Sequence, residues 1–217
     1  MTPNTHATVP SCGLEYEADI ARALAALRSG QVVVYPTETW YGMGVDALSI
    51  EALDRLFALK AREADKPVGL IVHDQDSAFA LAREVTPRAR LLAERFWPGA
   101  LTLVLPARSG LPRALIGPGG GVAVRVSSHP LARALAAAFR KPITATSANP
   151  ASLPPARDIT EAKAYFGAHL SVFVDGGWLS AQSSSTLVRA DEQGFTILRP
   201  GAISAQEITL ALSQRAL

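Results

Sequence analysis

The chain has 217 residues, of which 48% are hydrophobic and 18% are charged. This balance indicates a globular protein with a sizeable core and excludes a disordered one. The net charge of +2 is too small to argue for nucleic-acid binding. The single cysteine, Cys12, excludes an internal disulfide and a thiolate zinc cluster and favours a cytoplasmic location. We expect residues 1–16 to form a flexible tail and residues 17–217 to form one domain.

Helix and strand signals alternate from the start of the predicted domain. An amphipathic stripe over residues 17–28, followed by Gly30, predicts a helix with a glycine stop. A β-branched run at residues 32–35 predicts a strand. Ser49 can cap a second helix, which the pattern extends over residues 50–62.

The first predicted strand runs directly into the segment YPTETWYGMG at residues 35–44. Thr37, Glu38 and Thr39 follow a proline that ends the strand, and two glycines free the backbone. Ligands of open α/β sheets bind beyond strand ends, so these side chains could meet a substrate or could form an ordinary turn. The sequence lacks Gly-x-Gly-x-x-Gly and Walker lysine patterns, which excludes a standard nucleotide loop.

Two basic residues, Lys60 and Arg62, lie at the predicted end of the second helix. One interpretation is a solvated basic helix end, which complements the helix dipole. The other is a clamp for a triphosphate, because lysine neutralises phosphate charge and arginine adds bidentate hydrogen bonds.

The middle of the chain predicts three strands, at residues 68–72, 101–105 and 122–126, and a helix over residues 87–97 that begins at Thr86-Pro87. The third strand follows the glycine-rich run GPGGG, whose backbone N–H groups could bind an anion. Arg125 lies inside this apolar strand, where an unpaired charge would be costly. We therefore expect a carboxylate beside it, from the protein or from a ligand.

The last third predicts a helix over residues 129–139 capped by Ser128, strands at 143–146, 171–174, 186–189 and 195–198, and a final helix with a Ser204/Glu207 capping box. The spacing of the last two strands predicts a hairpin across residues 191–194. Strand runs without polar alternation favour strands covered on both faces. The predicted fold class is α/β (α+β), with helices flanking a mixed twisted sheet.

Small polar residues and an arginine recur at the late strand ends, at residues 144–150, 183–186 and 199–201. The sequence contains neither a Ser-His-Asp order nor a metal-ligand spacing, and its four histidines are scattered. The pattern favours a site that binds and aligns polar substrates over one built around a nucleophile.

Taken in order, these motifs resemble the short, TsaC-type form of the YrdC-like threonylcarbamoyl-AMP synthase family. The resemblance covers about residues 18–203 and rests on the segments 35–44, 60–62, 96–102, 124–126, 146–149, 185–186 and 198–201. It departs at Ser184, where the family has proline, and after Asn149, where a glycine is missing. A family histidine has no match, because His73 lies two residues beyond its place. The chain ends soon after Gly201, and we expect no further C-terminal domain.

The resemblance implies a concave sheet whose cavity holds ATP, L-threonine and bicarbonate, with Mg²⁺ on the phosphates. Threonine carbamate would attack the α-phosphate, giving threonylcarbamoyl-AMP and pyrophosphate, and partner proteins would transfer the group to a tRNA adenosine. The implied threonine-binding residues are Thr37, Arg125, Ala145 and Ser185, with Arg125 on the carboxylate. The implied ATP-binding residues are Lys60, Arg62, Gly121, Ser147, Asn149 and Arg199, and the basic pair would be catalytic.

Two alternatives stay open. A non-enzymatic module of this fold could use its basic residues to bind double-stranded RNA or tRNA, and salt would then weaken binding steeply. A related enzyme could keep the cavity and use another carbamoyl donor or amine, although the Lys60/Arg62 and Ser147/Asn149 motifs argue against it.

Overall fold

The structure is a computed structural model, and it describes residues 14–60, 67–151 and 153–213. The α-helices of this part are α1 (Leu14–Arg28), α2 (Ile50–Lys60), α3 (Gln75–Phe79), α4 (Pro87–Phe96), α5 (Pro130–Phe139), α6 (Ile159–Phe166) and α7 (Ala205–Ser213). The strands are β1 (Val33–Tyr35), β2 (Gly42–Gly44), β3 (Leu70–Val72), β4 (Leu101–Pro106), β5 (Gly121–Val126), β6 (Ile143–Thr144), β7 (Thr146–Ser147), β8 (Thr186–Ala190) and β9 (Phe195–Arg199). Among the described residues, no helix is long and apolar enough to cross a membrane.

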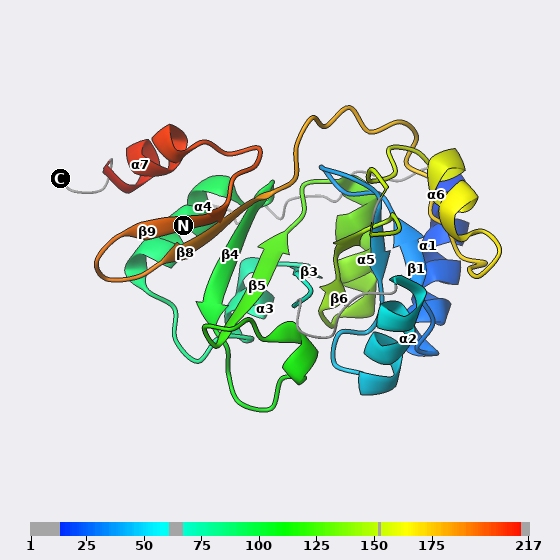
Figure 1. Cartoon of the computed structure of the whole chain (residues 1–217), viewed down its shortest axis with the longest axis horizontal. Helices are drawn as coiled ribbons and strands as arrows, with labels where there is room; N and C mark the ends of the chain where they lie inside the picture. Colours follow the sequence, from blue (N-terminus) through cyan, green and yellow to red (C-terminus); the bar gives the residue numbers. More distant parts are fainter. Residues whose placement is uncertain (1–13, 61–66, 152, 214–217) are drawn as a thin grey trace, which may run out of the picture.

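The strands form two sheets (Figure 1). The larger has the order β6-β3-β5-β4-β8-β9 and is mixed, because β3 with β5 and β4 with β8 are parallel and the other pairs are antiparallel. The smaller is antiparallel, with the order β1-β2-β7. The predicted α/β class with a mixed sheet and flanking helices is confirmed, as is the β8–β9 hairpin.

The predicted strand at residues 143–146 is in fact two strands. Ala145 separates β6, which pairs with β3 in the larger sheet, from β7, which pairs with β2 in the smaller one. The chain therefore passes between the sheets at this residue. The predicted strand at 171–174 is reduced to one bridge, between Val34 and Phe173.

The polar caps explain where several helices begin. Thr86 Oγ1 accepts from Ala89 N at 3.2 Å, and the predicted Ser204/Glu207 capping box forms. The prediction that Ser128 caps α5 is wrong. His129 is the cap, since its Nδ1 accepts from Leu131 N and Pro130 occupies the first helical position.

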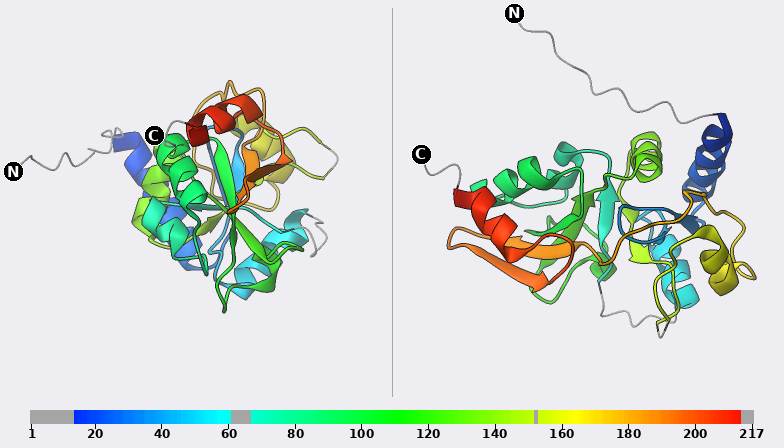
Figure 2. Two further views of the ribbon diagram at one scale, coloured as in Figure 1. Left: turned by 90° about the vertical axis from the view of Figure 1, so that its left-hand side faces the viewer. Right: turned by 90° about the horizontal axis from the view of Figure 1, so that it is seen from above.

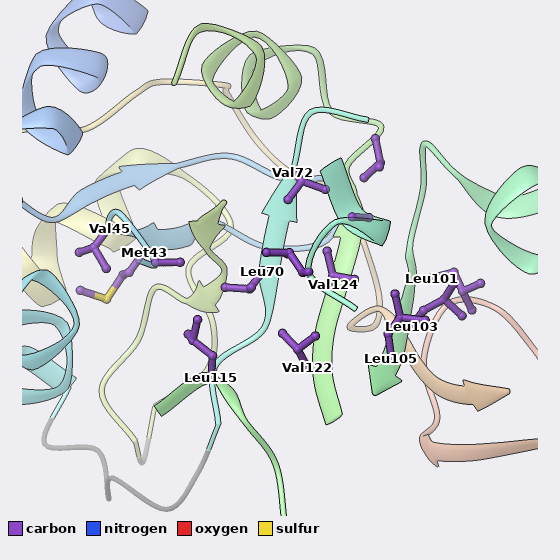
Figure 3. Packing of buried hydrophobic residues seen from close by; sticks show 14 of the residues in the cluster. Met43, Val45, Leu70, Val72, Leu101, Leu103, Leu105, Leu115, Val122 and Val124 are labelled. Carbon is purple, nitrogen blue, oxygen red and sulfur yellow. The ribbon is translucent and has the colours of Figure 1, made fainter. Parts of the chain in front are cut away.

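Three neighbouring strands, β5, β4 and β8, turn one face to the main core and the other away from it. Figure 3 shows Leu101, Leu103 and Leu105 of β4 packed with Val122 and Val124 of β5 in that core. The opposite face carries the alternate residues and lines a cavity. The prediction that both faces are covered is therefore wrong here. It failed because Val104, Ala123 and Leu187 on the cavity face are apolar too and hide the alternation.

Two pairs of helices pack beside the sheets. Helix α7 packs on α4 beside β8 and β9 at one end of the molecule, and α1, which packs on α5, lies at the other end (Figure 2). A second, smaller core lies between α1 and α5 and includes Leu27, Tyr35 and Leu135.

The cap of α4 gives a direct test of the fold. Thr86→Ala removes the cap and also the hydrogen bond from Thr86 Oγ1 to the Ala190 carbonyl at 3.0 Å. We expect the free energy of unfolding, measured by urea denaturation, to fall by about 1–2 kcal/mol. Thr86→Ser keeps the hydroxyl and should lose much less. An equal loss in both variants would contradict the assigned cap.

Candidate active site

A cavity of about 390 Å³ lies over the free face of β5, β4 and β8. Its floor consists of alternate residues on these strands and at their ends: Gly121, Ala123, Arg125, Thr102, Val104, Ser185, Leu187 and Arg189. Another side is lined by Ser147 of β7 and by four residues of the segment before β2, namely Thr37, Thr39, Trp40 and Tyr41. The volume is within the range of small-molecule sites.

The charge of the cavity lining has one sign. Among the described residues that line it are three arginines, Arg125, Arg189 and Arg199, and no aspartate or glutamate. Such a lining raises the local concentration of anions. Arg189 was not among the site residues predicted from the sequence. Its spacing could have indicated it, because residues two and four positions apart on a strand, here Leu187 and Ser185, lie on the same face.

Arg125 has the carboxylate partner that its apolar strand requires. Its Nε donates to Glu38 Oε1 at 2.8 Å, and the two side chains are only 8% and 10% exposed. The Ser127 hydroxyl donates to the other oxygen of Glu38. The expected carboxylate therefore comes from the protein, from the first polar motif. Glu38 does not itself line the cavity.

Arg199 is held differently, by uncharged groups. Its Nη2 donates to the Ser185 carbonyl at 2.8 Å and to Ser185 Oγ at 3.1 Å. Ser185 Oγ also shares a 2.7 Å hydrogen bond with Thr102 Oγ1. Partial burial in the cavity lowers the pKa of Arg199, and the positive charge of Arg125 lowers it further. The two guanidinium groups therefore repel each other.

Lys60 is the last residue of α2, and its ammonium group donates to the Ser147 carbonyl. Lys60 is 6% exposed, so the interpretation of a solvated helix end is wrong for it. Asn149 lies beside the same residue, with its Oδ1 accepting from Ser147 Oγ at 2.5 Å. Lys60 and Asn149 thus support the cavity wall at Ser147 without lining it. Arg62 lies outside the described residues.

The segment before β2 is held by its own hydrogen bonds. Thr37 Oγ1 donates to the Trp40 carbonyl at 2.7 Å and accepts from Thr39 N at 3.1 Å. Tyr41 OH donates to the Gly177 carbonyl at 2.9 Å and accepts from Gly176 N at 2.8 Å. These bonds join the motif to a loop more than a hundred residues away. Burial, the main cause, raises the pKa of Tyr41 to about 12.

The structure brings most of the implied site residues to one cavity. Those that line it are Thr37, Gly121, Arg125, Ala145, Ser147, Ser185 and Arg199. His73 does not, because its imidazole contacts Ser77 and Asp74 instead. The described residues contain no group of three or more His, Cys, Asp or Glu side chains that could hold a metal ion.

The raised pKa of Tyr41 gives a test at high pH. An unfolded tyrosine titrates near 10, whereas Tyr41 in the folded protein titrates near 12. The folded state therefore holds this proton more tightly, and the free energy of unfolding should fall as the pH rises from 10 to 12. Tyr41→Phe should be less stable at neutral pH and should show a shallower fall over this window. An unchanged slope in urea titrations would contradict the assignment.

Comparison with known proteins identifies relatives of this arrangement. The Sua5/YciO/YrdC family model, described as "Telomere recombination", matches residues 25–201. The threonylcarbamoyl-AMP synthase of Halorhodospira halophila is 42% identical over 183 residues, which cover 83% of this chain and 94% of that protein. The threonylcarbamoyl-AMP synthase of Pyrococcus abyssi is 35% identical over 198 residues, which cover 91% of this chain and 58% of that protein.

The fold has a solved counterpart as well. The crystal structure of P. abyssi Sua5 complexed with L-threonine matches with a TM-score of 0.85 at 36% identity, over 89% of this chain and 57% of that one. This chain thus spans just over half of the archaeal protein and nearly all of the H. halophila one. Because the family model matches most of the chain, as the order of the motifs indicated, this protein belongs to the Sua5/YciO/YrdC family.

Proposed function

We propose that this chain is an L-threonylcarbamoyl-AMP synthase, which converts L-threonine, bicarbonate and ATP to threonylcarbamoyl-AMP and pyrophosphate. The observation that carries the proposal is the arginine-lined cavity. It offers one carboxylate-paired arginine and two further arginines, Arg189 and Arg199, that form no ion pair with a carboxylate among the described residues. Two relatives bear this enzyme name, and P. abyssi Sua5 is known in complex with L-threonine.

Threonine binds in this proposal at the end of the cavity floor where Arg125 lies. Glu38 accepts from Nε of Arg125, and no other described residue forms an ion pair with this guanidinium, so its two terminal nitrogens could bind the threonine carboxylate as a pair. Thr37, Ala145 and Ser185 line the cavity with it and would surround the rest of the amino acid. The carboxylate is then held away from phosphorus, and the amino group is the part that reacts.

ATP binds in this proposal along Gly121, Ser147 and Arg199, with Lys60, Arg62 and Asn149 supporting the phosphates. Lys60 and Asn149 both contact Ser147, which lines the cavity. The absence of carboxylates from the described lining does not fit a Mg²⁺ ion held by protein side chains. Mg²⁺ would instead enter on the nucleotide phosphates, with water as its other ligands, and neutralise part of their charge.

The reaction needs alignment more than acid-base groups. The threonine amine adds to bicarbonate with loss of water, giving a carbamate. A carbamate oxygen then forms a bond to the α-phosphorus of ATP while the bond to pyrophosphate breaks. The arginines and Lys60 would neutralise the charges that approach each other, which is the main task in transfer at phosphorus.

The product carries an activated carbamoyl group, which suits it to transfer onto a nucleophile. We propose that partner proteins move this group to an adenosine of tRNA in the cytoplasm. Direct contact of this chain with tRNA belongs to the same proposal.

The reaction predicts an absolute need for bicarbonate. Because Arg125 would hold the threonine carboxylate, that group cannot attack ATP as it does in amino-acid adenylation. Pyrophosphate release with threonine and ATP should therefore stop in bicarbonate-depleted buffer and return when bicarbonate is added. Release without bicarbonate would indicate a different adenylating reaction. No release under any condition, with salt-sensitive RNA binding, would favour the non-enzymatic alternative.

The division of roles predicts separate effects on the two substrates. Arg125→Lys keeps a charge beside Glu38 and loses the bidentate fork. We expect the KM for threonine to rise at least about tenfold and the KM for ATP to change by less than about threefold. Arg22→Ala, which removes an arginine that is 69% exposed on α1, is the matched control and should change neither. Equal losses for both substrates in a folded Arg125→Lys protein would refute the division.

A further inference from the structure

We propose that Glu38 is a specificity-determining residue that reserves Arg125 for a singly charged carboxylate and makes this part of the cavity reject phosphate. The inference rests on the proposed function, because it concerns how one cavity can accept both an amino acid and a nucleotide. Glu38 would act through Arg125 and not by touching the substrate, since it does not line the cavity and its side chain is 10% exposed.

Arg125 and Arg199 differ in the charge of the groups that bind them. Arg125 has a carboxylate 2.8 Å from its Nε, whereas within the described part of the chain Arg199 is bound by the carbonyl and hydroxyl of Ser185. Arg125 therefore offers the cavity a hydrogen-bonding fork whose charge is already balanced by Glu38. Arg199 forms no ion pair with a described carboxylate, so the described residues leave its charge unbalanced. The same side-chain type thus presents two different binding sites in one cavity.

Charge balance favours a monoanion on Arg125. A ligand on the terminal amino groups lies across the guanidinium from Glu38, and the two negative groups repel each other. Coulomb repulsion is proportional to the ligand charge, so a phosphate dianion would suffer about twice the repulsion of a carboxylate. The fork still gives a carboxylate two parallel hydrogen bonds. Glu38 therefore weakens the binding of a phosphate dianion to Arg125 by about twice the free energy by which it weakens that of a carboxylate, and so shifts the preference of Arg125 toward the carboxylate.

The side chain of Glu38 is also held on the side that faces away from Arg125. The Ser127 hydroxyl donates to its second oxygen, and Ser127 Oγ also accepts from His129 N at 3.2 Å. Burial, the main cause, lowers the pKa of His129, so this imidazole is neutral at neutral pH and does not cancel the carboxylate charge. Ser127 is fully buried, which keeps water from the back of the pair.

A cavity with three arginines in its lining needs a way to keep phosphate groups from the threonine position. ATP, pyrophosphate and inorganic phosphate all carry more charge than threonine, and each would compete for an unbalanced guanidinium. With Glu38 behind Arg125, phosphate groups are directed toward Arg199 and the wall at Ser147 that Lys60 supports, and the threonine position stays available.

The test is the isosteric variant Glu38→Gln, whose amide oxygen can still accept from Arg125 Nε. Dissociation constants for inorganic phosphate and for L-threonine would be measured by calorimetry at mildly alkaline pH, where phosphate is mostly a dianion. We expect the ratio of the phosphate constant to the threonine constant to fall at least about tenfold. Phosphate should also become a stronger competitive inhibitor against threonine in pyrophosphate release.

Asp46→Asn is the matched control. Asp46 also forms an ion pair, with Lys141 at 2.7 Å, and its side chain is equally buried at 10% exposure, but it does not line the cavity. This variant should leave the phosphate-to-threonine ratio unchanged. Ser127→Ala, which loosens Glu38, should shift the ratio in the same direction as Glu38→Gln by a smaller factor, and it decides the matter if Glu38→Gln does not fold.

An unchanged ratio in folded Glu38→Gln, or equal tightening of phosphate and threonine, would overturn the inference. If Ser127→Ala has to decide, an unchanged ratio there would do the same. These results differ from a failure of the proposed function. In that case the unmodified protein would show neither threonine binding nor bicarbonate-dependent pyrophosphate release.

Discussion

The site depends on one constraint, which is that β5, β4 and β8 must keep one face in the core while the other remains open. The register in which Leu103 pairs with both Val124 and Val188 keeps all three strands in phase. A slip of one residue would exchange the faces, and Arg125 would enter the apolar core. The valines and leucines of the core face therefore fix the register, and the register fixes where the cavity residues lie.

Close packing of the smaller sheet brings the polar segment at residues 35–44 over the cavity floor. A Cβ atom on Gly44 would lie 2.6 Å from Ile143 Cγ2 and 2.7 Å from Tyr35 Cε1, so only glycine allows β2 to approach this closely. That approach lets β2 lie between β1 and β7. The preceding residues then reach the cavity, with Glu38 behind Arg125. The glycines of this segment thus allow the strands to pack closely, and its polar side chains form part of the site.

Local sequence signals predicted most of the fold, but contacts between residues far apart in the sequence could not be predicted. Apolar runs predicted β4, β5 and β8, and the need for a carboxylate beside Arg125 followed from burial alone. Its source did not, because Glu38 lies 87 residues away in the sequence. The Gly-Met-Gly strand β2 has no β-forming signal, since pairing on both sides defines it. The burial of Lys60 was missed for the same reason, because Ser147, to which it donates, lies 87 residues further along the chain.

The cavity brings positive charges together, and anionic ligands would relieve their repulsion. Arg125 lowers the pKa of Arg199, which means that the two cations raise each other's energy in the same space. Glu38 offsets this on one side only. An anion between or beside the arginines would remove the remaining repulsion, and the hydrogen bonds of Ser185, Thr102 and Ser127 already hold the side chains in place. In the proposed reaction, little reorganisation would be needed when the anionic groups of the substrates approach, and this preorganisation could replace the aspartate, glutamate and histidine side chains that the described lining lacks.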